Sequence, residues 1–313
     1  MTLTEAPPVP PAAPLPAPAA APPAPPERRP SRPDGPQLVG AALVITAALL
    51  LGLLLELGPL GGLRHLRDAE TGYAQLRESL ALGTAPVGQL GHDGKPVVPG
   101  TPVALLEIPQ LGLREVVREG TAGGVLEYGP GHRRDTPMPG QAGTSVLLGR
   151  QSGYGGPFGT LAQLHTGETF TVTTGQGRHR FRVVAVRRAG DPVPPAVKAG
   201  AGRIVLVTGA GARYAPSGTL LVDADLTTPV KPANARPLTA AALPAGEKAM
   251  GRDDGAWVPL VLWGEGLLLA AVALAAAWAG WGRRQAWIVG VPVLSALALA
   301  VADEVARLLP NLI

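Results

Sequence analysis

The stretch Ser145-Val-Leu-Leu-Gly-Arg-Gln-Ser-Gly-Tyr-Gly-Gly-Pro-Phe158 joins a short apolar run to a turn rich in glycine and proline. The run 145–148 is predicted to be a strand, and Leu161 and Leu164 predict a short helix after the turn. Other segments rich in β-branched and aromatic residues, some of them alternating with polar ones, predict further strands. These are 103–108, 169–173, 178–188, 203–208 and 219–225. The region is therefore expected to be mainly β.

This stretch and the preceding Gly129-Pro-Gly-His-Arg-Arg-Asp-Thr-Pro-Met-Pro-Gly-Gln-Ala-Gly143 closely resemble the sortases, especially the class E and F type of high-GC Gram-positive bacteria. That family typically carries Gly-His-Arg, a short spacer and Tyr-Gly-x-Pro-Phe, and the likeness runs from Ile108 to Asp225. It implies a closed β-barrel of about eight strands with short helices. It also implies a cysteine transpeptidase that acts on a sorting-signal peptide.

The catalytic positions of the family are all substituted here. Aligned on Tyr154-Gly-Gly-Pro-Phe158, the catalytic His falls on Arg150, the Cys on Gly209, and the Arg on Thr219 or Gly218. The whole chain contains no cysteine. A sortase needs a low-pKa thiolate and a proton-transfer partner, whereas Gly209 has no side chain and Arg150 stays protonated. The resemblance thus predicts an inactive homologue with no catalytic residues, in which Arg150 acts as a fixed cation.

A recruited Ser/Thr-His site is the enzymatic alternative, because a hydroxyl beside an oriented imidazole can replace a thiolate. The available groups are Thr208, Ser145, Ser152, Ser217, His132, His165 and His179. His132 is the best candidate, since its Gly-Pro-Gly-His run matches a sortase motif. The simpler interpretation is that Thr208 fills a strand position, His132 satisfies a loop, and His179 lies on an exposed strand face.

Peptide binding is the leading functional hypothesis, with His132, Arg150, Tyr154 and Thr208 as the candidate binding residues. A guanidinium at position 150 can clamp a carboxylate in bidentate fashion, such as a peptide C-terminus or an acidic residue of a partner. The competing interpretation is that Arg150 pairs with a nearby acid, Asp135 or Glu127. Two further functions stay open at this point: partnership with an active sortase or a pilin, and a membrane scaffold with no peptide binding.

Three apolar segments are each long enough, or nearly so, to cross a bilayer as a helix. They are Leu38–Leu57, Trp257–Trp281 with tryptophans at both ends, and Ala286–Ala302. Gly282-Arg-Arg-Gln285 makes the last two a helical hairpin. Glu265 lies inside the second segment. A carboxyl within a membrane span is a functional candidate; alternatively, protonation or pairing near the interface neutralises it. Leucines and a tyrosine between charges over 61–81 predict a juxtamembrane helix.

Basic residues in short flanks decide orientation. Arg28, Arg29 and Arg32 precede the first span, and Arg283 with Arg284 fill the hairpin. Both flanks are therefore expected in the cytoplasm, which places the N-terminus inside and the barrel outside a multi-pass cell-membrane protein.

Composition agrees with this organisation. A large share of the chain's 35 prolines falls within the first 36 residues, which predicts a disordered arm. A net charge of +4 from scattered basic residues argues against nucleic acid, and the lack of cysteine removes zinc-thiolate and iron-sulfur sites, so no metal or cofactor is expected. Few lysines among many Arg, Ala, Gly and Pro suggest a high-GC, actinobacterial genome. The predicted order is an arm (1–37), a span (38–58), a juxtamembrane helix and linker (59–100), the barrel (101–226), a linker (227–256) and two spans (257–281 and 286–304).

Overall fold

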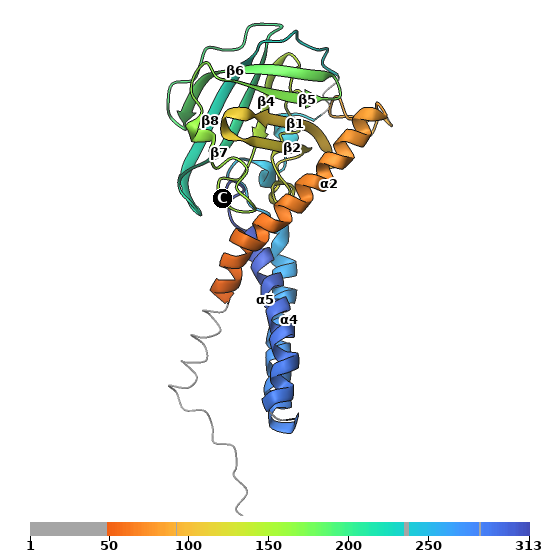
Figure 1. Ribbon diagram of the computed structural model, residues 1–313, viewed down its shortest axis with the longest axis vertical. Helices are drawn as coiled ribbons and strands as arrows, with labels where there is room; N and C mark the ends of the chain where they lie inside the picture. Colours follow the sequence, from red (N-terminus) through yellow and green to blue (C-terminus); the bar gives the residue numbers. More distant parts are fainter. Residues whose placement is uncertain (1–48, 92, 235–237, 282) are drawn as a thin grey trace, which may run out of the picture. The chain divides into compact units, whose positions relative to one another are not determined.

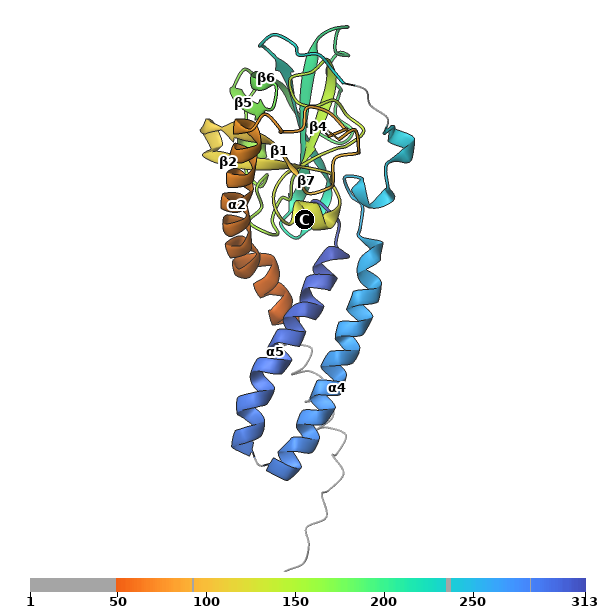
Figure 2. The ribbon, with the colours of Figure 1, turned by 90° about the vertical axis from the view of Figure 1, so that its right-hand side faces the viewer.

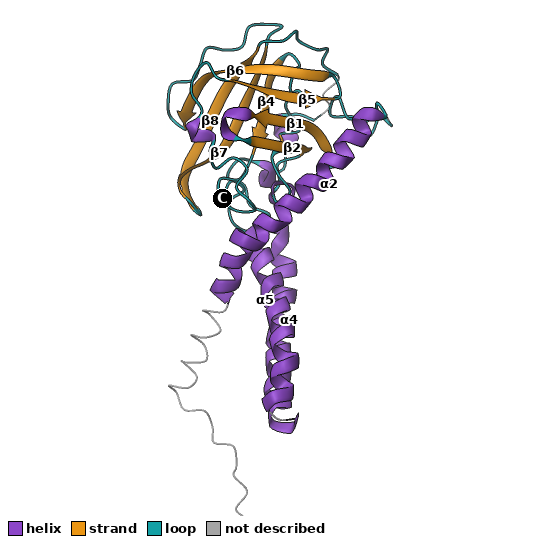
Figure 3. Cartoon of the chain, in the orientation of Figure 1, coloured by secondary structure: helices purple, strands orange, loops and turns teal. Residues whose placement is uncertain are grey.

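The computed structural model describes residues 49–91, 93–234, 238–281 and 283–313. The predicted arm and most of the first predicted span lie outside these residues. The strands are β1 (Pro102–Ile108), β2 (Leu113–Glu119), β3 (Gly131–His132), β4 (Gly143–Leu148), β5 (Thr169–Thr174), β6 (Gly177–Arg188), β7 (Gly202–Ala212) and β8 (Ala215–Leu226). They close into one barrel in the order β1-β2-β3-β4-β7-β8-β6-β5, drawn in orange in Figure 3. The predicted eight-stranded barrel is confirmed.

Side chains of β7 alternate between two apolar environments, as the period of two in a strand requires. Ile204 and Leu206 face the barrel interior, where Phe170 and Phe181 stack with ring centroids 5.7 Å apart. Val205 and Val207 face outward and belong to a second apolar cluster. The outer face of this strand is therefore apolar and must be covered.

Two strands were not predicted. β2 carries four charged residues among its seven, which weakens its apolar alternation, and β3 is only two residues long. β3 pairs parallel with β2 and antiparallel with β4, so its position depends on partners distant in sequence. β7 and β8 are also longer than predicted and pair up to Ala212 and Ala215, so Gly209 lies within a strand.

Long helices flank the barrel sequence. The π-helical segment Glu56–Leu60 leads into α2 (Gly61–Ala81), which matches the predicted juxtamembrane helix, and α4 (Trp257–Trp281) and α5 (Arg283–Arg307) follow the barrel. The two C-terminal helices lie side by side (Figure 2). Among the described residues, three helices are long and apolar enough to cross a membrane: Leu49–Ala81, Asp254–Leu274 and Arg284–Arg307.

The six residues after α5, which we call the tail (308–313), return to the barrel. The end of the chain, marked C in Figure 1, lies beside it. Leu312 is fully buried and joins Val205 and Val207 in the second apolar cluster. The tail therefore helps to cover the apolar outer face of β7.

Candidate functional site

The three residues predicted to replace the catalytic residues lie at one end of three adjacent strands. β4 and β7 run parallel with Leu148 opposite Val207, so Arg150 follows β4 beside the end of β7. Gly209 pairs directly with Thr219 across β7 and β8. The structure thus brings Arg150, Gly209 and Thr219 to one place, as expected if they descend from one catalytic centre.

Arg150 is almost completely buried, with 1% of its surface exposed. Its Nη2 donates to the carbonyl of Gly123 at 3.0 Å, and its guanidinium carbon lies 4.8 Å from the ring centre of Tyr154. Nε and Nη1 have no hydrogen-bond partner among the described residues. Burial lowers the pKa of this guanidinium, while Tyr154 and Glu127 oppose the shift. Arg150 is therefore a buried cation with unused donors.

Neither acid proposed as a partner of Arg150 is its ion-pair partner in the structure. Asp135 accepts two hydrogen bonds from Arg133, both at 2.6 Å, which hold the pKa of Asp135 below its usual range. Glu127 pairs instead with Arg307, with Nε and Oε1 3.4 Å apart. Burial raises the pKa of Glu127 to about 7, although Arg307 and Arg150 pull it down. The carboxylate of Glu127 therefore acts on Arg150 only through a longer-range electrostatic interaction.

Backbone fills the space at the nucleophile position. A Cβ atom on Gly209 would lie 2.9 Å from the carbonyl oxygen of Leu312 and 2.9 Å from Oε1 of Gln151. The same Leu312 carbonyl accepts a hydrogen bond from the backbone N–H of Gln151 at 3.0 Å. Glycine at the predicted nucleophile position therefore makes room for the tail.

A groove of about 490 Å³ runs along the outer face of β4, β7 and β8. Leu148, Val207 and Thr219 line its floor, and residues of the linker between 240 and 249 form a wall. Arg133, Arg187 and Lys248 give it a basic edge. An apolar floor with a few polar groups is typical of a ligand-binding site.

His132 is a buried member of an ion pair. Its Nδ1 lies 2.8 Å from Oε2 of Glu119, and its Nε2 lies 3.0 Å from the carbonyl of Pro137 and 3.2 Å from Oγ1 of Thr136. Burial lowers the pKa of His132, but Glu119 and the hydrogen bonds outweigh it, so the net pKa is raised. Both ring nitrogens therefore donate hydrogen bonds. The imidazole holds the loop that contains Pro137, as in the simpler interpretation.

The other candidate residues lie elsewhere. Thr208 is buried on the interior side of β7, opposite to the groove-facing Val207, because side chains alternate. Tyr154 has a left-handed backbone with φ of 51° and packs with Leu57 and Ala306. The prediction that His179 is exposed is wrong: 1% of it is exposed, and its Nε2 lies 3.1 Å from Oγ1 of Thr174, inside the barrel wall.

The hydroxyls predicted as replacement nucleophiles have no base beside them in the described part of the chain. The hydroxyls of Ser145, Ser152 and Thr208 are buried and have no hydrogen-bond partner there. Among the same residues, no imidazole is hydrogen-bonded to Ser217, and His165 is exposed. The Thr-His contacts that the structure does show, Thr136 with His132 and Thr174 with His179, involve buried hydroxyls, and neither threonine lines the groove.

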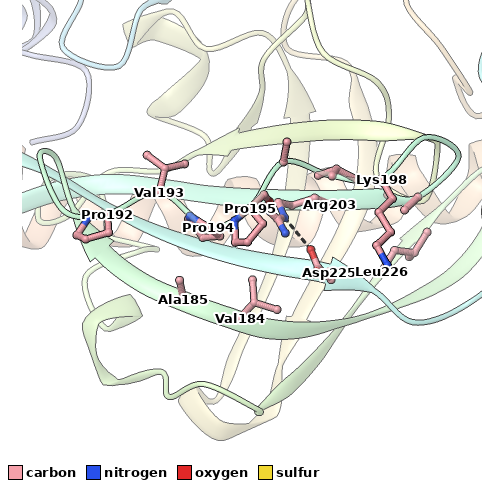
Figure 4. Close-up of a pocket in the computed structure, with 14 residues that line it drawn as sticks. Val184, Ala185, Pro192, Val193, Pro194, Pro195, Lys198, Arg203, Asp225 and Leu226 are labelled. Carbon is pink, nitrogen blue, oxygen red and sulfur yellow. Dashed lines mark hydrogen bonds and ion pairs between the residues drawn. The ribbon is translucent and has the colours of Figure 1, made fainter.

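A second cavity, of about 680 Å³, lies between the loop 189–201 and strands β6, β7 and β8 (Figure 4). The ion pair of Arg203 with Asp225, 2.6 Å apart, crosses it, and Arg203 also donates to the carbonyl of Pro195. None of the predicted site residues lines this cavity. Among the described residues, no group of three His, Cys, Asp or Glu side chains is arranged to hold a metal.

Three residues of the site were not predicted from the sequence: Gln151, Asn311 and Leu312. Gln151 directly follows Arg150, and this neighbourhood could have indicated that it belongs to the site. The tail residues follow a predicted span and carry no strand or helix periodicity. Glu265, predicted as a functional candidate, lies exposed on α4, and no ion pair within the described ranges reaches it.

Comparison with known proteins supports the resemblance. The family model for the sortase domain matches residues 106–226. No match was found among curated proteins. A sortase D5 transpeptidase of Clostridium perfringens is 18% identical over 52% of this chain and 99% of its own, with a TM-score of 0.43. Sortase E of Streptomyces avermitilis is 28% identical over 42% of this chain and 91% of its own, with a TM-score of 0.36.

Residues 106–226 are therefore a sortase domain. The match ends at Leu226, the last residue of β8, so α4, α5 and the tail lie outside it. Any role of the tail in the groove is thus a feature of this chain beyond its matched domain.

The ion pair of His132 predicts how stability depends on pH. Because its pKa is raised above 6.5 in the folded state, it stabilises the fold fully below about pH 6.5, and this contribution is lost as the pH rises through the folded-state value. We compare the full chain with the double variant His132→Gln/Glu119→Gln, which removes both charges. The difference in free energy of unfolding should fall by about 1 kcal/mol or more between about pH 6 and pH 9.

Urea unfolding in detergent, followed by circular dichroism, gives this difference. His165→Gln is the control, because this imidazole is exposed. A difference that stays constant over the same range would show that His132 is neutral in the folded protein.

Proposed function

We propose that this protein is a membrane-anchored, extracytoplasmic sortase homologue that holds a peptide in its groove without reacting with it. The observation that carries the proposal is the pair of substitutions at one end of the groove. Gly209 offers no nucleophile, and Arg150 offers no proton acceptor but has two unused donors. A site that lacks the reacting groups and keeps a recognition surface supports binding rather than catalysis.

The chemistry of the groove supports an extended peptide as the bound species. Its floor of outward-facing Leu148 and Val207 suits apolar side chains, and the edge made by Arg133 and Lys248 suits carbonyls or acids. Arg150 follows β4 beyond this floor and is buried, and its Nε and Nη1 have no hydrogen-bond partner among the described residues. The peptide class that fits the resemblance is a sorting signal, presented by a wall-anchored protein, a pilin or an active sortase partner.

A scaffold without peptide binding is the second candidate. The observation in its favour is the burial of Arg150 at 1% exposure, which requires local movement before a ligand touches it. Titration of the protein with sorting-signal peptides separates the two functions, because a scaffold binds none of them.

The full chain in detergent is expected neither to cleave nor to transfer Leu-Pro-x-Thr-Gly or Leu-Ala-x-Thr-Gly peptides. Loss of a catalytic nucleophile costs about 10⁶ in rate in a well-studied protease, so product should stay at the level of the peptide alone. Mass spectrometry with an added amine acceptor measures both reactions. Turnover that persists in Thr208→Ala and His132→Ala would refute the proposal and place a site elsewhere.

The orientation that we propose follows from the arginine clusters, with Arg283 and Arg284 in the cytoplasm and the barrel outside. The chain has no thiol, so single cysteines report topology without background. In intact cells, an impermeant maleimide should label Lys198→Cys, in the exposed loop 189–201, and leave Gln285→Cys unlabelled. Both should react after lysis. The reverse pattern in intact cells would invert the topology.

A further inference from the structure

The tail packs against residues that line the groove, next to the predicted nucleophile position Gly209. The Leu312 carbonyl is bonded to the N–H of Gln151, and its side chain is buried among Leu148, Val205 and Val207. The carbonyl oxygen of Ile313 lies 3.2 Å from a Cβ built on Gly153. The tail thus makes both main-chain and apolar side-chain contacts, the two kinds that an extended peptide makes with a groove.

Asn311 fixes the direction of the tail. It is fully buried, and its Nδ2 reaches the carbonyl oxygens of Thr121 at 3.2 Å and Lys248 at 3.1 Å, as well as that of Gly246. Its backbone N–H donates to Gly251 at 3.0 Å. An amide buried in this way is costly unless every contact is kept, so the tail has one favoured register.

Ion pairs hold the start of the tail. Arg307, the last residue of α5, contacts Glu127 at 3.4 Å and Asp303 at 3.2 Å. Glu127 ends the short helix whose Gly123 carbonyl accepts from Arg150. The tail is therefore fixed at both ends to the residues that surround the substituted catalytic positions.

The sequence of the tail resembles the ligand class proposed for the groove. Leu309-Pro310-Asn311 shares its first two residues with Leu-Pro-x-Thr-Gly and is followed by Leu312 and Ile313. Each contact described above involves a segment that is covalently joined to the barrel. Its effective concentration at the groove is therefore high, and a separate peptide binds only after displacing it.

We propose that the tail, through Leu309–Ile313, is the built-in ligand of the groove, and that an external Leu-Pro peptide binds by replacing it. This inference rests on the proposed peptide-binding function and adds the identity of the resident peptide. Gly209 is the residue that permits it, because any side chain there collides with Leu312.

Cysteine labelling tests whether the tail is seated. In the full chain, maleimide should modify Leu312→Cys at least about tenfold more slowly than Lys198→Cys, because reaction requires the tail to leave. Gly209→Ala should raise the rate at Leu312→Cys by about tenfold or more, whereas Gly218→Ala should not. Gly218 is the matched control, since a Cβ there meets no atom within 4 Å. Equal rates at Leu312→Cys and Lys198→Cys would overturn the inference.

Peptide binding tests whether the seated tail is a ligand. Fluorescent Leu-Pro-Asn-Leu-Ile and Leu-Pro-x-Thr-Gly peptides are titrated against the full chain and a chain ending at Arg307, both in detergent. The shorter chain should bind at least one of them about tenfold or more tightly than the full chain. Its circular dichroism and its Lys198→Cys labelling rate report that the barrel is intact. This titration does not depend on the folding of Gly209→Ala.

The two ideas fail in different ways. Equal binding by both chains would overturn the inference and leave the proposed function standing. Slow labelling of Leu312→Cys with no peptide bound by either chain would overturn both, and would make the tail a structural clasp.

Discussion

The contact between the Leu312 carbonyl and Gly209 is the constraint on which the rest of the groove depends. A Cβ at position 209 would approach that oxygen to 2.9 Å, closer than side-chain carbons come in folded proteins. If Gly209 holds the predicted nucleophile position, a nucleophilic side chain and the tail of this chain would require the same space. Here the space holds backbone, and the N–H of Gln151, next to Arg150, is bonded to it.

The apolar outer face of β7 explains why a tail is needed there. Val205 and Val207 point away from the barrel interior, and without cover they would meet water. Full burial of one leucine side chain such as Leu312 stabilises the folded state by about 1.5–3 kcal/mol. The linker wall at Ala249 adds to the same cluster. Cover from two segments outside the matched domain connects the barrel to α4 and α5.

The buried charges follow from the same arrangement. Arg150 is enclosed between the Gly123 carbonyl and Tyr154, and Tyr154 packs with Ala306 of α5. A buried cation with two free donors is costly. Tyr154 thus connects this buried cation to the helix that leads into the tail.

Local patterns predicted much of this molecule. Alternation and motif likeness predicted the barrel, and the charge-interrupted leucines over 61–81 predicted α2 to the residue. Strand β2 was missed because its charges hide its apolar positions, and β3 because two residues carry no period. The burial of His179 and the position of Leu312 depend on contacts with segments distant in sequence, which no single segment's periodicity encodes.

Hydrogen exchange at the backbone amide of Gln151 tests the central claim most directly. In the full chain this N–H donates to Leu312 and should exchange slowly, and in a chain ending at Arg307 it should exchange at least about tenfold faster. The amide of Gly149, bonded to Val207 within the barrel, should stay protected in both and serves as the internal control. Equal exchange of the Gln151 amide in the two chains, with Gly149 unchanged, would contradict the seating of the tail at Gly209.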